Sequence, residues 1–107
     1  MTPGLDKDSE HGNCHVEPLE KLVPAQALET AAQVFLLVWG MGCPNCAMRV
    51  RNSLLQLDGV LAVDISLERG LARVRYDASQ VGPDLFPDAV AKAGDGQRHR
   101  YAAQILV

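Results

Sequence analysis

The sequence lacks most of the features that mark membrane, secreted or nucleic-acid-binding proteins. No apolar run approaches the roughly 20 residues that cross a bilayer, so we do not expect an embedded protein. Asp6, Lys7, Asp8 and Glu10 lie where a signal peptide would need an apolar core. No basic tract with interleaved aromatic residues suggests nucleic-acid binding. Because 107 residues leave room for one domain, we expect a single small cytoplasmic domain.

Cysteine is also scarce, and its placement is informative. Cys14, Cys43 and Cys46 cannot all pair within one chain, and cytoplasmic thiols stay reduced. Cys43 and Cys46 stand three positions apart in the stretch Gly-Met-Gly-Cys-Pro-Asn-Cys, where the glycines allow a sharp bend. A helix that begins near Cys46 would direct its unpaired N–H groups at both sulfurs and favour the thiolate. The pair is therefore either a soft-metal site or a redox couple.

The first 32 residues differ in composition from the rest of the chain. They carry a net charge of −4, from six acidic and two basic side chains, whereas residues 33–107 carry +1. We expect residues 1–32 to be a mostly flexible extension, with a short helix over 24–32. His11, Cys14 and His15 lie in this extension. Cys14 could give a bound ion a third thiolate, and His11 or His15 could complete a four-ligand zinc site.

Periodic apolar patterns predict the fold of residues 33–107. Alternating apolar residues indicate strands, and three- and four-residue spacings indicate helices. The expected elements, in order, are a strand at 34–39, a helix at 46–57, a hairpin at 62–68 and 71–77, a helix from about 84 to 93 and a strand at 101–107. This βαββαβ order is the α+β, ferredoxin-like sandwich, with two helices on one face of a four-stranded antiparallel sheet.

Residues 33–107 resemble the heavy-metal-associated domain of small copper chaperones, copper-transporting P-type ATPases and mercury-binding proteins. The segments that match are residues 40–46 (GMGCPNC), 59–67, 72–77 and the Ala-Gly pair at 93–94. The resemblance implies that 33–107 is one such domain and that Cys43 and Cys46 bind one soft ion, most often Cu(I). Ag(I), Hg(II), Zn(II) and Cd(II) are further candidates. The sequence departs from the family at Asp95, where many bacterial members place an aromatic residue near the metal.

These features predict a metallochaperone-like protein rather than an enzyme. It would exchange Cu(I), held by Cys43 and Cys46, with a metal-transporting P-type ATPase or a metal-responsive regulator. A buffering role and a metal-bridged homodimer are also open. The alternative is a glutaredoxin-like thiol–disulfide oxidoreductase, because Cys-Pro-x-Cys is also a redox motif. Against that alternative, a tight hairpin directly follows the first helix, where a thioredoxin-like chain needs a longer crossover.

Several neighbours of the cysteine pair have expected roles. The resemblance implies that Met41 packs under the loop and does not bind metal. Met48, in the first helical turn, and His99, in a late loop, are expected to be exposed to solvent. Arg49 and Arg51 fall on the outer face of the first predicted helix, where they would be solvated or meet an acidic partner.

Overall fold

The computed structural model describes residues 16–94 and 99–106. Its regular elements follow the predicted order, with one short helix in front of it. They are α1 (Ala25–Glu29), β1 (Ala32–Trp39), α2 (Pro44–Leu55), β2 (Val60–Ser66), β3 (Leu71–Tyr76), the 3-10 turn η2 (Pro83–Leu85), α3 (Phe86–Lys92) and β4 (Ala102–Leu106). No helix in these ranges is both long enough and apolar enough to span a bilayer.

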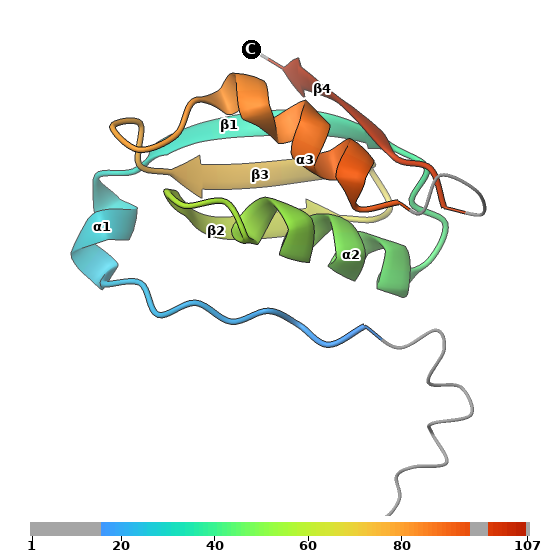
Figure 1. Cartoon of the computed structure of the whole chain (residues 1–107), viewed down its shortest axis with the longest axis horizontal. Coiled ribbons are helices and arrows are strands. Elements are labelled where there is room, and N and C mark those ends of the chain that lie inside the picture. The colour runs from blue at the N-terminus through green and yellow to red at the C-terminus, as the bar shows by residue number, and fades with distance from the viewer. Residues whose placement is uncertain (1–15, 95–98, 107) are drawn as a thin grey trace, which may run out of the picture.

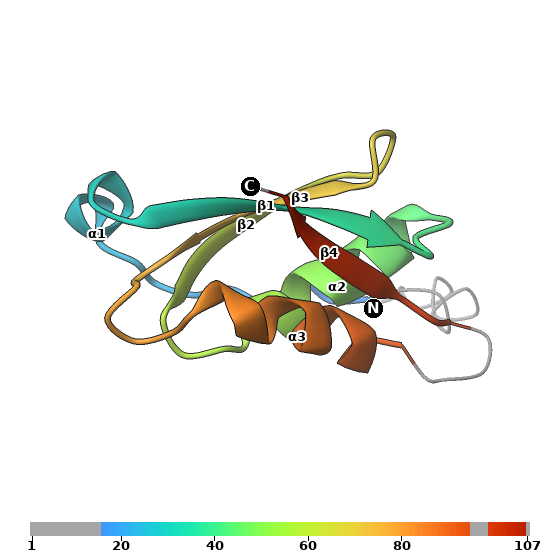
Figure 2. The ribbon, with the colours of Figure 1, turned by 90° about the horizontal axis from the view of Figure 1, so that it is seen from above.

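The four strands form one antiparallel sheet in the order β2-β3-β1-β4. β1 lies in the middle, paired with β3 on one side and with β4 on the other. Figure 2 shows α2 and α3 together on one face of this sheet, while α1 stands at its end. This arrangement confirms the predicted ferredoxin-like sandwich.

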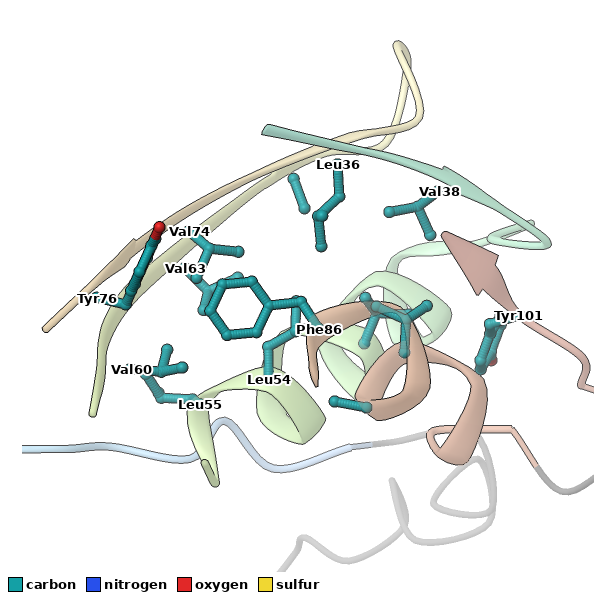
Figure 3. Packing of buried hydrophobic residues seen from close by; sticks show 14 of the residues in the cluster. Leu36, Val38, Leu54, Leu55, Val60, Val63, Val74, Tyr76, Phe86 and Tyr101 are labelled. Carbon is teal, nitrogen blue, oxygen red and sulfur yellow. The ribbon is translucent and has the colours of Figure 1, made fainter. Parts of the chain in front are cut away.

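The hydrophobic core fills the space between the sheet and the two helices. Both layers contribute side chains with no exposed surface; the largest are Leu36 of β1, Val60 of β2, Val74 of β3, Val50 and Leu54 of α2, and Phe86 and Val90 of α3. Phe86 lies in the middle of this cluster (Figure 3) and meets the Tyr76 ring edge-on, with 5.2 Å between the ring centroids. An edge-to-face aromatic pair adds roughly 0.5–1.5 kcal/mol to the burial of area.

The hairpin follows the predicted alternation closely. Ala72, Val74 and Tyr76 of β3 are buried, and the turn between the strands contains Gly70 in a left-handed conformation, with φ of 65°. The pattern fails at Leu67, which was expected to continue the buried face of β2. β2 ends at Ser66, and Leu67 is 36% exposed.

Helix boundaries differ from the expected ones at three places. α2 begins at Pro44 rather than near residue 46, because proline suits the first helical position and Cys43 serves as the N-cap. The last helix starts as a 3-10 turn at Pro83 and becomes α-helical at Phe86. α1 has only five residues, which is shorter than the span predicted for 24–32.

Residues 17–21 lie along α2 without forming a helix or strand, and we call this segment the strap (Figure 1). The Asn52 side chain accepts a hydrogen bond from the Leu19 N–H and donates one to the Glu17 carbonyl. At the other end, the Lys21 ammonium donates to the carbonyls of Leu55, Leu57 and Val60, at and beyond the end of α2. Part of the extension that the composition marked as flexible is therefore bonded to the domain.

Candidate metal centre

The cysteine loop leaves β1 through a glycine that no other residue could replace without strain. Gly40 has φ of +99°, and a Cβ there would overlap the Arg100 carbonyl oxygen as the chain enters β4. Left-handed backbone and close approach are the two conditions that select glycine. Gly42, by contrast, is not left-handed, and a Cβ there would meet nothing within 4 Å. Of the two glycines expected to make the bend, only Gly40 is required.

The start of α2 places both sulfurs at the helix N-terminus. Cys43 is the extended N-cap residue, and its carbonyl accepts hydrogen bonds from the N–H groups of Cys46 and Ala47, at 3.0 and 3.2 Å. Cys46 therefore lies in the first turn, where the positive end of the helix dipole favours an anionic sulfur. The two Sγ atoms are 3.5 Å apart.

The two cysteines differ in exposure. Cys46 is 6% exposed and belongs to the hydrophobic core, whereas Cys43 is half-buried. Tyr101, directly before β4, is also buried, and its hydroxyl has no well-formed hydrogen bond within the described residues. One sulfur is thus anchored in the domain and the other can be reached from solvent.

Opposing effects act on the Cys46 thiol. Burial raises its pKa, but the nearby Tyr101 hydroxyl, the backbone of Gly42 and the Cys43 thiol together outweigh burial, so the pKa of Cys46 is lowered. Tyr101 shifts in the other direction: burial and the neighbouring sulfur raise the pKa of its hydroxyl, which keeps it protonated. A protonated hydroxyl beside Cys46 favours the thiolate, which is the form that binds metal.

The sulfur separation can be compared with the distances that a metal requires. Thiolate–metal bonds of roughly 2.3 Å put two sulfurs about 4.6 Å apart when the ion lies in line between them. In a planar three-sulfur arrangement the same bonds put neighbouring sulfurs about 4.0 Å apart. The observed 3.5 Å is closer to the second value. A soft ion therefore fits the pair after a sulfur movement of about 0.5–1 Å.

The described residues supply no further ligand to this pair. Within 16–94 and 99–106, no three His, Cys, Asp or Glu side chains come close enough together to hold an ion. The other predicted candidates, His11, Cys14 and His15, lie outside the described residues.

The residues around the loop only partly match expectation. Met41 is half-buried against the core, as predicted. Met48 and His99 were expected to be exposed, but both are half-buried, and the His99 ring lies 6.3 Å from the Tyr101 ring. Arg51 is not simply solvated: its guanidinium donates to the Leu19 carbonyl of the strap at 2.9 Å.

Sequence reasoning missed Tyr101 as part of this centre. The aromatic residue of related domains was sought at position 95, directly after Gly94, and position 95 lies outside the described residues. Tyr101 instead approaches Cys46 from the residue directly before β4. The available signal was the alternation of Tyr101, Ala103 and Ile105, which predicts that Tyr101 faces the core.

Together the fold and loop define a class: a small ferredoxin-like domain that presents two thiols at one end of its sandwich. The heavy-metal-associated domain model matches residues 35–95. The chain is 38% identical over 63 residues to the copper chaperone CopZ of Staphylococcus aureus (strain JH9), and the match covers 59% of this chain and 93% of that protein. This chain belongs to the heavy-metal-associated domain family.

Solved structures of the same family share the fold. The structure is similar to that of a CopZ metallochaperone, with a TM-score of 0.60 and 34% identity, over 68% of this chain and 100% of that one. It is also similar to a copper-binding domain from HMA7, a P-type ATPase, with a TM-score of 0.63 and 25% identity, over 70% of this chain and 93% of that one. The glutaredoxin-like alternative finds no support in the fold or in these relatives.

Proposed function

We propose that this protein binds one soft heavy-metal ion, Cu(I) above all, through Cys43 and Cys46 and exchanges it with a partner. The observation that carries the proposal is the sulfur pair itself, 3.5 Å apart at a helix N-terminus. Thiolates select soft ions such as Cu(I), which needs fewer ligands than structural zinc. The copper-binding relatives favour Cu(I) over Ag(I), Hg(II), Zn(II) and Cd(II).

The unequal exposure of the two cysteines suits transfer by ligand exchange. A thiolate of the partner would bond to the ion while the accessible Cys43 sulfur leaves, and a second partner thiolate would then replace the buried Cys46. The ion keeps its oxidation state throughout, so no electron donor or acceptor is required. This is the action of a carrier rather than an enzyme, and we place it in the cytoplasm, where thiols stay reduced.

The partner we favour is a metal-transporting P-type ATPase. A domain of such an ATPase is among the structures similar to this chain. Two domains of one fold that each present two thiols can share an ion between facing loops. A metal-responsive regulator, and a second copy of this chain bridged by metal, would use the same exchange.

Cu(I) affinity in the presence of a competing chromogenic chelator tests this function. We expect one tightly bound ion per wild-type chain and loss of tight binding in Cys43→Ser and in Cys46→Ser. Cys14→Ser is the matched control, since it removes one thiol outside the pair and should still bind one ion. Unchanged affinity in both pair variants would refute the assignment.

A further inference from the structure

The face of the sheet that α2 and α3 leave uncovered carries large apolar side chains. Leu36 and Val38 of β1 point into the core, toward the helices (Figure 3). Phe35, Leu37 and Trp39 alternate with them along β1 and therefore lie on the opposite face. Figure 2 shows α2 and α3 on the other side of the sheet from these residues. We call the uncovered side the open face.

Cross-strand pairing joins these side chains into one apolar patch, because residues directly opposite each other in an antiparallel pair share a face. Phe35 lies opposite Leu106 of β4. Leu37 lies opposite Leu71 of β3. Trp39 is 48% exposed and Phe35 is 41% exposed, and Leu106 is also exposed. Single exposed apolar residues are common on proteins, but a contiguous patch of this kind marks a surface that another molecule covers.

Charges of both signs border the patch. Arg73 of β3 donates two hydrogen bonds to the Asp64 carboxylate of β2, at 2.7 and 3.2 Å, and Arg75 lies 3.7 Å from the same carboxylate. The turn between β2 and β3 adds Glu68 and Arg69, one charge of each sign. An anionic lipid surface would favour basic side chains alone. An apolar centre with both charges at its border is instead complementary to a second copy of itself.

We propose that two copies of this protein pair through their open faces, with the two sheets packed against each other about a two-fold axis. In such an interface the same patch serves both copies, so Asp64 of one copy can meet the arginines of the other. A shallow hollow of about 290 Å³, lined in part by Phe35, Leu71 and Arg73, can receive an aromatic side chain of the second copy. This contact involves neither a metal ion nor the cysteines, and so differs from a metal-bridged pair.

The size of the open face sets the strength of this contact. Four strands about 4.8 Å apart cover a width of roughly 19 Å, and strands of five to eight residues are roughly 17–26 Å long. Two such faces bury about 600–1,000 Å² in total, which is less than the roughly 1,600 Å² of a stable interface. We therefore expect a reversible dimer with a dissociation constant on the order of 0.1 mM, as for small transient interfaces.

Trp39 reports this contact directly, because it is the only tryptophan in the sequence and stands in the patch. In reduced, metal-free protein, we expect the mass measured by sedimentation to rise from one chain toward two between micromolar and millimolar concentration. Over the same range the Trp39 emission should shift to shorter wavelength, and its quenching by acrylamide should fall. The mass of one chain at millimolar concentration, or a dimer in which the Trp39 emission does not change, overturns the proposal.

Substitutions test whether the contact uses this face. Phe35→Glu, and Leu106→Glu on the edge strand, each place two like charges in the interface and should weaken dimerisation by roughly tenfold or more. Both positions are exposed in the single chain, so unfolding followed by circular dichroism should show that each variant keeps its fold. Leu85→Glu is the matched control, because Leu85 is as exposed as Trp39 but lies in η2, which leads into α3. Equal dimerisation of the three variants overturns the assignment of the open face.

A membrane surface is the other occupant that an exposed apolar patch could have, and vesicles distinguish it from a second copy. Vesicles of phosphatidylcholine and phosphatidylserine, added to micromolar protein, should leave the emission of Trp39 unchanged. A shift to shorter wavelength with these vesicles, while the protein alone stays a single chain at every concentration, would assign the open face to a lipid surface and overturn the dimer.

Discussion

Lys21→Met is the substitution that probes the strap most sharply. Methionine keeps an unbranched apolar stem and removes the ammonium group. The ammonium donates to the carbonyls of Leu55, Leu57 and Val60 at 2.9, 3.0 and 2.7 Å. Those groups lie at or beyond the end of α2, where carbonyls lack a partner within the helix and a cation is also favoured by the dipole.

The expected loss is much smaller than the sum of three charged hydrogen bonds. Each is worth roughly 1.5–3 kcal/mol when buried, but Lys21 is an exposed residue, and water can bond to the released carbonyls. Helix-end contacts of this kind contribute about 1–2 kcal/mol in total. For a domain of this size that loss lowers Tm by roughly 5–15 °C.

Urea and thermal unfolding, followed by circular dichroism, measure this loss. Lys92→Met is a suitable control, because it also removes a lysine ammonium near the C-terminal end of a helix, α3, and Lys92 is not part of the strap. We expect its effect to stay within a few tenths of a kcal/mol, as for a single exposed charge near a helix end. Equal stability of Lys21→Met and Lys92→Met would refute the docked strap.

Three further substitutions test the cysteine loop, the Tyr101 hydroxyl beside it and the turn after β3. Gly40→Ala should lower the free energy of unfolding in urea by at least about 1–2 kcal/mol, because alanine is strained in the left-handed conformation and its Cβ would overlap the Arg100 carbonyl oxygen. An unfolding midpoint equal to that of the wild type would contradict the loop geometry. Tyr101→Phe should raise the pKa of Cys46, because the tyrosine hydroxyl lowers that pKa in the wild type. Titration of thiolate absorbance in the apo protein measures the shift. An unchanged titration would show that the hydroxyl does not act on Cys46. Asp77 has a lowered pKa, chiefly because the Ser79 hydroxyl bonds its carboxylate, so wild type should exceed Asp77→Asn in stability at neutral pH and lose that advantage as pH falls through the folded-state pKa. An advantage that persisted in strong acid would rule out the carboxylate as its source.

The sheet and its two covering helices could be predicted because each carries its own local pattern. Alternation in β3 fixes which side chains are buried, and the apolar stripe of α2 at Val50 and Leu54 fixes its inner face. The predicted start of α2, near residue 46, was wrong, although Pro44 suits the first helical position and carried the signal for the true start. Its placement two residues earlier puts Cys43 at the cap.

The features that could not be predicted from the sequence depend on contacts between distant parts of the chain. Nothing near Lys21 in sequence marks the carbonyls that it meets more than 30 positions later. Tyr101 meets Cys46 only because β4 lies beside β1, a pairing that local periodicity does not place.

The central claim is that Cys43 and Cys46 hold the ion, and the accessible Cys43 offers its most direct test. A short pulse of an alkylating reagent, followed by mass spectrometry of the peptides, reports the reactivity of each cysteine separately. In the apo protein we expect Cys43 to react readily and the buried Cys46 slowly. One equivalent of bound Cu(I) should abolish alkylation of Cys43. Alkylation of Cys43 at its apo rate, with copper still bound to the protein, would contradict the account.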